Sequence, residues 1–204
     1  MRSINIISDY IDFYDNLSDN KSPITYKRNM CDCKQIGTAL KYLRNIGIKT
    51  IDVKPVSSFN IFDGDIMVYT NPVKHSNDDK KIVSVEYAKT VYPTCVASKC
   101  LSSDNLITIK YLQIGKRRFT LTYKSNDKSL NKRYLVDISE SSPSYNMLIG
   151  LPIFSIDYII DKGIMIATDF SEVENLKELG VEKIITAEEI VEEIRQSILT
   201  YNKI

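Results

Sequence analysis

The sequence has little of what most catalytic motifs need. Its 204 residues contain one histidine, His75, and no tryptophan. Any Ser–His or Cys–His pair, and any imidazole metal ligand, would have to use that one side chain. His75 lies in the polar stretch 71–79, which predicts a surface loop. Histidine-based catalysis and histidine metal sites are therefore not expected.

Glycine motifs and long apolar runs are also missing. None of the seven glycines forms a GxG or GxxxxGK pattern, so the Walker and dinucleotide-binding fingerprints are absent. No apolar run approaches the roughly 18 residues that span a bilayer. Residues 1–15 lack the apolar core of a signal peptide. We expect a cytoplasmic protein that has no membrane contact and no cofactor.

The four cysteines argue for free thiols rather than disulfides, because no secretory signal accompanies them. They are Cys31, Cys33, Cys95 and Cys100. Together they could form a tetrahedral zinc site, although the C-x-C and C-x4-C spacings differ from the usual pattern. Cys33 is also a candidate reactive thiol, because it would lie in the first turn of a helix capped by Asp32. The alternative is a small residue packed at a helix start.

A helix, a glycine and a strand follow one another near each end of the chain. The first unit has a helix over 36–46 behind an N-cap at Asp32, then Gly47 and a strand over 48–53. The second has a helix opened by Ser171-x-x-Glu174, then Gly180 and a strand over 181–185. Thr186-x-x-Glu189 opens a closing helix whose apolar stripe contains Ile190, Val191, Ile194 and Ile198.

Short segments rich in β-branched and aromatic residues fill the middle of the chain. They predict strands over 66–70, 82–87, 92–97, 106–113, 118–123, 134–138, 152–160 and 164–168. Helices and strands do not alternate here, so we predict an α+β fold with a central, mainly antiparallel sheet. The chain reads as a single domain over 1–204. A serine-rich linker allows a subdivision into 1–140 and 146–204.

The strongest charge feature is a basic segment between Lys110 and Tyr134. It contains eight basic residues and one acid, a net +7, whereas the whole chain has +1. Alternation places its aromatic side chains toward the core and predicts a cationic hairpin. Its candidate contact residues are Lys110, Lys116, Arg117, Arg118, Lys124, Lys132 and Arg133. The acids between Glu188 and Glu193 could pair with this face within the protein or across a dimer.

A second candidate site lies where the strand over 164–168 runs into the next helix. A strand end that meets a helix N-terminus exposes unpaired amides, which suit a small phosphorylated ligand. Thr168, Asp169 and Ser171 would line this site, although Asp169 would repel a phosphate. Helix capping by Ser171 is the competing explanation of the same residues.

Several short motifs resemble a family of uncharacterised proteins from large bacteriophages and some bacteria. They are Ile6-Ile-Ser-Asp-Tyr10, Val91-Tyr-Pro93, Pro152-Ile-Phe154 and the stretch 176–190. The resemblance implies a phage-type protein in the host cytoplasm and transfers no catalytic residue.

These patterns lead to two hypotheses. The first is a non-enzymatic, phage-type binding protein that contacts a protein or a nucleic acid through the basic hairpin. The alternative is an enzyme or sensor of a small phosphorylated ligand at the C-terminal α/β unit. Enzymatic activity is left open, and a homo-oligomer is possible.

Overall fold

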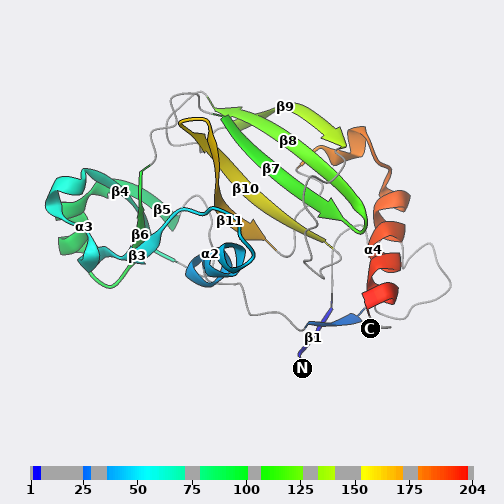
Figure 1. Ribbon diagram of the computed structural model, residues 1–204, viewed down its shortest axis with the longest axis horizontal. Helices are drawn as coiled ribbons and strands as arrows, with labels where there is room; N and C mark the ends of the chain where they lie inside the picture. Colours follow the sequence, from blue (N-terminus) through cyan, green and yellow to red (C-terminus); the bar gives the residue numbers. More distant parts are fainter. Residues whose placement is uncertain are drawn as a thin grey trace.

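The structure is a computed structural model that describes residues 2–5, 25–28, 36–71, 79–100, 107–125, 133–140, 153–171 and 179–201. Within these ranges the strands form three antiparallel sheets, of five, four and two strands (Figure 1). The two-stranded sheet pairs β1 (Arg2–Asn5) with β2 (Thr25–Arg28). Both larger sheets have helices packed on them. The predicted α+β class is therefore confirmed.

The five-stranded sheet has the order β11-β10-β7-β8-β9. Its strands are β7 (Ile107–Ile114), β8 (Arg117–Ser125), β9 (Arg133–Glu140), β10 (Ile153–Asp161) and β11 (Ile164–Ser171). Helix α2 (Ile36–Asn45) packs against β11, where Tyr42 contacts the ring of Phe170. Helix α4 (Ala187–Tyr201) lies beside the β7–β8 turn (Figure 1). Residues 111–114 are all buried, so both faces of β7 are covered.

The four-stranded sheet has the order β3-β6-β4-β5. Its strands are β3 (Val53–Pro55), β4 (Asp65–Tyr69), β5 (Lys80–Ser84) and β6 (Val96–Lys99). Helix α3 (Val85–Val91) and two short 3-10 turns, Val56–Ser58 and Ile61–Asp63, cover one face. That face has its own core, which contains Val56, Phe59, Ile66, Val68, Val85, Ala88 and Ala97. On the other face, Tyr69 joins the core of the five-stranded sheet.

Most predicted elements are present, with corrected boundaries. Gly47 and Gly180 have the expected left-handed backbone, with φ of 87° and 74°. The Thr186–Glu189 capping box forms, because Thr186 Oγ1 accepts from Glu189 N at 3.2 Å and Glu189 Oε2 accepts from Thr186 N at 2.8 Å. The prediction of a strand over 181–185 is wrong, because Val181–Lys183 is a 3-10 turn.

Helix α3 is the main element that sequence reasoning missed. Residues 82–87 predicted a strand because they contain β-branched and aromatic residues. In the structure Ser84 is an N-cap, and its hydroxyl accepts from Tyr87 N at 3.2 Å. Val85 and Ala88 then lie on one buried helical face. A good N-cap and a buried apolar pair outweigh the weak strand propensity of this short segment.

Some predictions fall outside the described residues. They concern the cap at Asp32, the helix that follows Ser171 in the predicted capping box Ser171-x-x-Glu174, the linker residues 141–145 and His75. Over the ranges given above, no helix is long and apolar enough to cross a membrane.

Candidate functional site

The basic segment does not form one cationic surface. Lys110 is buried, with a relative exposure of 4%. Arg118 is half-buried, and its Nε donates to Gln113 Oε1 at 3.4 Å. Lys124 is exposed. Lys132 lies outside the described residues. Lys110 is paired with Leu121 and so lies on the face of β8 that carries its buried side chains, whereas Lys124 lies on the other face. Alternation within each strand did not contain this register.

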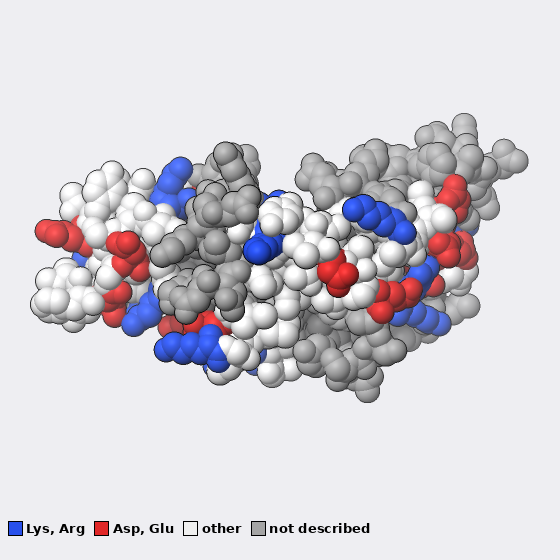
Figure 2. All heavy atoms as spheres, turned by 90° about the horizontal axis from the view of Figure 1, so that it is seen from above, with Lys and Arg blue, Asp and Glu red and all other residues white. Residues whose placement is uncertain are grey.

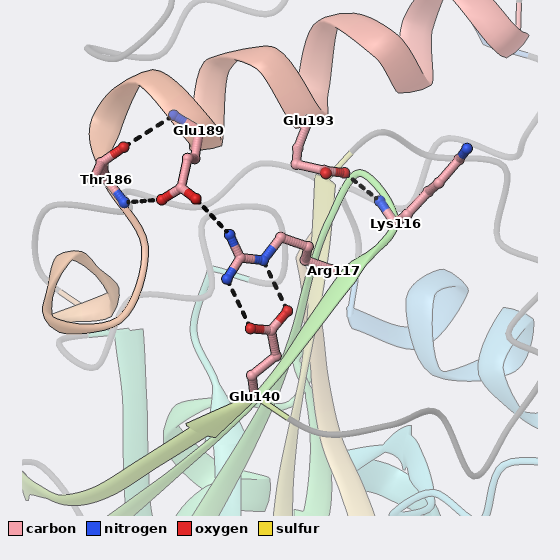
Figure 3. A network of polar contacts seen from close by, with 6 residues as sticks. All are labelled: Lys116, Arg117, Glu140, Thr186, Glu189 and Glu193. Atoms are coloured by element: carbon pink, nitrogen blue, oxygen red, sulfur yellow. Dashed lines mark hydrogen bonds and ion pairs between the residues drawn. The ribbon is translucent and has the colours of Figure 1, made fainter.

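The tip of the β7–β8 hairpin is neutralised by acids of the same chain (Figure 3). Arg117 donates two hydrogen bonds to Glu140, at 2.7 and 2.8 Å, and its Nη1 lies 3.4 Å from Glu189 Oε1. The backbone N of Lys116 donates to Glu193 Oε2 at 3.0 Å. The paired guanidinium lowers the pKa of Glu140. The prediction that acids over 188–193 pair with the basic hairpin inside the protein is therefore confirmed.

Charges of both signs are interspersed on one face of the described surface. On the face seen in Figure 2, lysine and arginine side chains lie next to aspartate and glutamate side chains. A single-sign field of the kind that attracts a polyanion is not visible on this face.

A compact charged group lies instead on the five-stranded sheet. Lys110 Nζ lies 2.9 Å from Asp157 Oδ1 and donates to Ser155 Oγ at 3.3 Å. Arg133 Nη2 lies 3.8 Å from Asp157 Oδ2. Asp169 is the cross-strand partner of Asp157. We call these five residues, Lys110, Arg133, Ser155, Asp157 and Asp169, the Asp157 cluster.

Strand register explains how this cluster assembles. Asp157 on β10 stands opposite Lys110 on β7 and opposite Asp169 on β11. Directly opposed residues of antiparallel strands point to the same face, with Cβ atoms about 4.5–5.5 Å apart. Two carboxylates and one ammonium are therefore adjacent on a single face. Ser155, two residues before Asp157, belongs to the same face.

Asp157 Oδ1 lacks a hydrogen-bond donor with good geometry among the described residues. This oxygen is buried, and among the described residues it accepts no hydrogen bond, although Lys110 Nζ is 2.9 Å away. The contact is therefore a charge contact with poor hydrogen-bond geometry. On the same face, the Thr108 hydroxyl is also buried, without a hydrogen-bond partner over the described ranges. Buried polar atoms of this kind call for a physical explanation, such as a bound ion or water.

The predicted ligand residues Thr168, Asp169 and Ser171 lie within β11 rather than at a helix N-terminus. Thr168 is the extra residue of a bulge in the β10–β11 pairing, and its hydroxyl donates to the carbonyl O of Asp157 at 3.2 Å. Asp169 Oδ1 accepts from Phe170 N at 2.8 Å. The structure therefore brings Asp169 to Asp157, and Ser171 to Ser155, by cross-strand pairing.

Tyr69 marks where the two large sheets meet near this cluster. Its hydroxyl and the Ser98 hydroxyl, both from the four-stranded sheet, are 3.3 Å apart. Burial raises the pKa of Tyr69 to about 12, and the negative charge of Asp169 contributes to the increase. Asp169 thus lies close enough to act electrostatically on the four-stranded sheet. The Asp157 cluster borders the junction of the two sheets.

The structure does not test the zinc prediction fully. Cys31 and the thiol candidate Cys33 fall outside the described residues, whereas Cys95 and Cys100 are free thiols. Burial raises the pKa of the Cys100 thiol. Within the described part of the chain, three or more His, Cys, Asp or Glu residues nowhere gather into a metal site.

Sequence reasoning missed Asp157, Ser155 and their link to Lys110. The local signal was present: Ser155-x-Asp157 interrupts an otherwise apolar strand. A polar pair at a spacing of two in a buried strand indicates polar groups on one covered face. The partner Lys110 is 47 positions earlier, and only the pairing of β7 with β10 identifies it.

The protein resembles known proteins in its fold and not in its sequence. No protein-family model matches the sequence, and no curated protein sequence matches it. Solved structures of D-alanine–D-alanine ligase, a macrocyclase, an ATP-grasp ligase and pyruvate carboxylase share its fold, at sequence identities of 7–15%.

Three of these structures show the extent of the likeness. D-alanine–D-alanine ligase from Bacillus anthracis, complexed with ATP, has a TM-score of 0.55 and 13% identity, over 84% of this chain and 67% of that one. The macrocyclase MdnC from Microcystis aeruginosa, bound with precursor peptide MdnA, has a TM-score of 0.54 and 11% identity, over 82% of this chain and 61% of that one. The RiPP-associated ATP-grasp ligase from Chryseobacterium gregarium, in complex with ADP and a leader and core peptide, has a TM-score of 0.54 and 11% identity, over 79% of this chain and 58% of that one.

The structural neighbours correct the first functional hypothesis. A non-enzymatic, phage-type binding protein was expected to act through the basic hairpin. The structural neighbours are instead ATP-grasp and related ligases. The residues of the hairpin tip also have intramolecular partners, so the net charge of the segment overstated its capacity to bind a polyanion.

Proposed function

We propose that this protein binds a magnesium–ATP complex at the Asp157 cluster and uses it in an enzymatic reaction of the ligase type. The observation that supports the proposal is the buried Asp157 oxygen without a directed partner, beside a buried lysine and a second carboxylate. The fold shared with structures that contain ATP or ADP supports the same nucleotide. The chain spans about two thirds of the length of the D-alanine–D-alanine ligases.

The residues present fit a magnesium ion that arrives with a nucleotide. Mg²⁺ usually binds proteins through one or two carboxylates, with substrate phosphates and water as its other ligands. Asp157 and Asp169 supply two carboxylates on one face of the sheet. A protein cage of three or more ligands is not required, and within the described residues no group of three or more His, Cys, Asp or Glu side chains gathers. When bound, the metal would supply charge neutralisation for phosphoryl transfer.

The remaining members of the cluster have roles that follow from their charge. Lys110 holds Asp157 in place and offers a buried ammonium to the phosphates, since water is excluded around it. Ser155 fixes the position of the Lys110 ammonium by accepting its hydrogen bond. The use of ATP in the proposed reaction also suggests that the protein works in the cytoplasm.

Isothermal titration calorimetry with Mg–ATP tests the proposal. The wild-type chain should bind one equivalent of Mg–ATP, and binding should disappear when EDTA removes the metal. D157N and D169N should each weaken binding by at least about tenfold, the loss seen even for residues that only support metal ligands. D161N is the matched control, because Asp161 lies in the same hairpin, at the turn end of β10. Its affinity should match the wild type.

Two results would refute the proposal. One is a wild-type chain that binds no Mg–ATP in the calorimeter. The other is a D169N variant that binds as well as D161N. D169N is the decisive variant, because Lys110 is in charge contact with Asp157 and D157N could perturb folding. Circular dichroism of each variant confirms that the fold is intact.

A further inference from the structure

Arg133 extends across the face of the five-stranded sheet to reach the Asp157 cluster. It is the first residue of β9, whereas Asp157 is on β10, and strands β8 and β7 lie between them. Its guanidinium carbon is 4.9 Å from the centroid of the Tyr123 ring on β8. Its Nη2 then reaches within 3.8 Å of Asp157 Oδ2. The Tyr123 ring therefore supports the guanidinium at a distance from its own strand.

Asp157 consequently has one cation at each carboxylate oxygen. Lys110 is at Oδ1 and Arg133 is at Oδ2. The two cations differ in accessibility, because the Lys110 side chain is 5% exposed and the Arg133 side chain is 32% exposed. Lys110 is fixed by burial and by Ser155. Arg133 is the cation that a ligand from solvent can draw away.

This arrangement opposes a bare divalent cation. A cation at Asp157 would have to displace Arg133 from Oδ2 and would be repelled by two positive charges close by. A metal–nucleotide complex avoids this repulsion, because its phosphates give Arg133 and Lys110 new anionic partners. The same arginine therefore hinders the metal alone and favours the metal with a nucleotide.

We propose that Arg133 makes the metal and the nucleotide bind as a unit, by occupying Asp157 until triphosphate oxygens take over its guanidinium. This inference rests on the proposed function and adds the order of binding at that site. Arg133 is thus a positioning residue with effects of opposite sign on two ligands. A purely structural role would change both affinities in the same direction.

The test measures both affinities in R133M, which keeps the apolar stem over Tyr123 and removes the charge. Mn²⁺ without nucleotide is titrated by electron paramagnetic resonance, and Mg–ATP by calorimetry. R133M should bind Mn²⁺ alone about tenfold more tightly and Mg–ATP about tenfold more weakly than the wild type. R133K keeps a positive charge, and both of its affinities should lie between those of R133M and the wild type. R133M combined with D157N should lose the gain in Mn²⁺ affinity, which assigns that gain to Asp157.

Shifts of the two affinities in the same direction, or no shift in either, would overturn the inference. If R133M does not fold, R133Q provides the same comparison. Failure of the proposed function is distinguishable, because the wild type would then bind no Mg–ATP, whereas the Mn²⁺ titration does not depend on nucleotide.

Discussion

At the residue scale, Lys110 shows how a charge is accommodated inside this protein. A buried ammonium is costly unless an anion and hydrogen bonds surround it. Asp157 and Ser155 supply these contacts. In the sequence, Lys110 resembled any basic residue of a cationic strand. Its burial depends on β10, which supplies Asp157 from 47 positions later, and no local pattern contains that information.

Replacement of Lys110 by methionine should destabilise the protein by about 2–3 kcal/mol. Removal of one partner of a buried ion pair usually costs about 3–5 kcal/mol, and the loss is smaller here because the Asp157 side chain is 20% exposed. K124M is the control, since the exposed Lys124 on the neighbouring strand should change stability by less than about 0.5 kcal/mol. Urea unfolding followed by circular dichroism gives both values. Equal effects of the two substitutions would contradict the buried pair.

At the element scale, α4 lies directly on the β7–β8 turn. A Cβ at Gly115 would lie 2.5 Å from the backbone O of Glu193 and 2.6 Å from its carboxylate. Gly115 also has a φ of 57°. The turn therefore needs glycine both for its backbone conformation and for the approach of the helix. The capping box and the apolar stripe predicted α4 well, but its position on the turn is a tertiary contact that periodicity does not contain.

G115A should loosen α4 from the turn. We expect a loss of about 2–3 kcal/mol, from the strained backbone and from the displaced helix. G163A is the matched control, because Gly163 closes the other hairpin of the sheet with a φ of 76° and open space around it. Its cost should be the backbone strain alone, about 1 kcal/mol. Hydrogen exchange should show lower protection of α4 amides in G115A only. Unchanged α4 protection would disprove this contact.

At the scale of the whole molecule, two sheets with separate helical layers meet at Tyr69. Sequence patterns predicted segments that overlap the strands of the two larger sheets but placed them in one central sheet, and they did not predict β1 and β2. The division into two sheets follows from strand order, because β6 pairs with β3 and β4 and does not pair with β7. Strand propensity carries no information about such partners. For the same reason, the alternative ligand site was predicted at Asp169 but not at its partner Asp157.

The Arg117 network joins three distant parts of the chain, so its loss should appear in global stability. Hydrogen bonding to Arg117 lowers the pKa of Glu140 below its ordinary value. A carboxyl whose pKa is lower in the folded state stabilises above its unfolded pKa, and this contribution disappears as pH falls through the folded pKa. Relative to wild type, E140Q should be less stable near neutral pH by at most about 1 kcal/mol, since the pair is half exposed.

The difference between E140Q and the wild type should begin to shrink as the pH falls below about 4.5, the unfolded pKa, and vanish once the pH is below the lower pKa of Glu140 in the folded protein. Urea unfolding at a series of pH values checks this expectation. E188Q, which changes an exposed acid of α4, should follow the wild type at every pH. A constant difference across the whole range would exclude titration of Glu140 as the cause.

The contact between Lys116 and Glu193 spans 77 positions of the chain. A ribosome delivers the β7–β8 hairpin first, and several seconds pass at about 5–20 residues per second before Glu193 follows. During that interval Lys116 and Arg117 lack their contacts with Glu193 and Glu189. Docking of α4 on the β7–β8 turn therefore follows the synthesis of all five strands of the larger sheet.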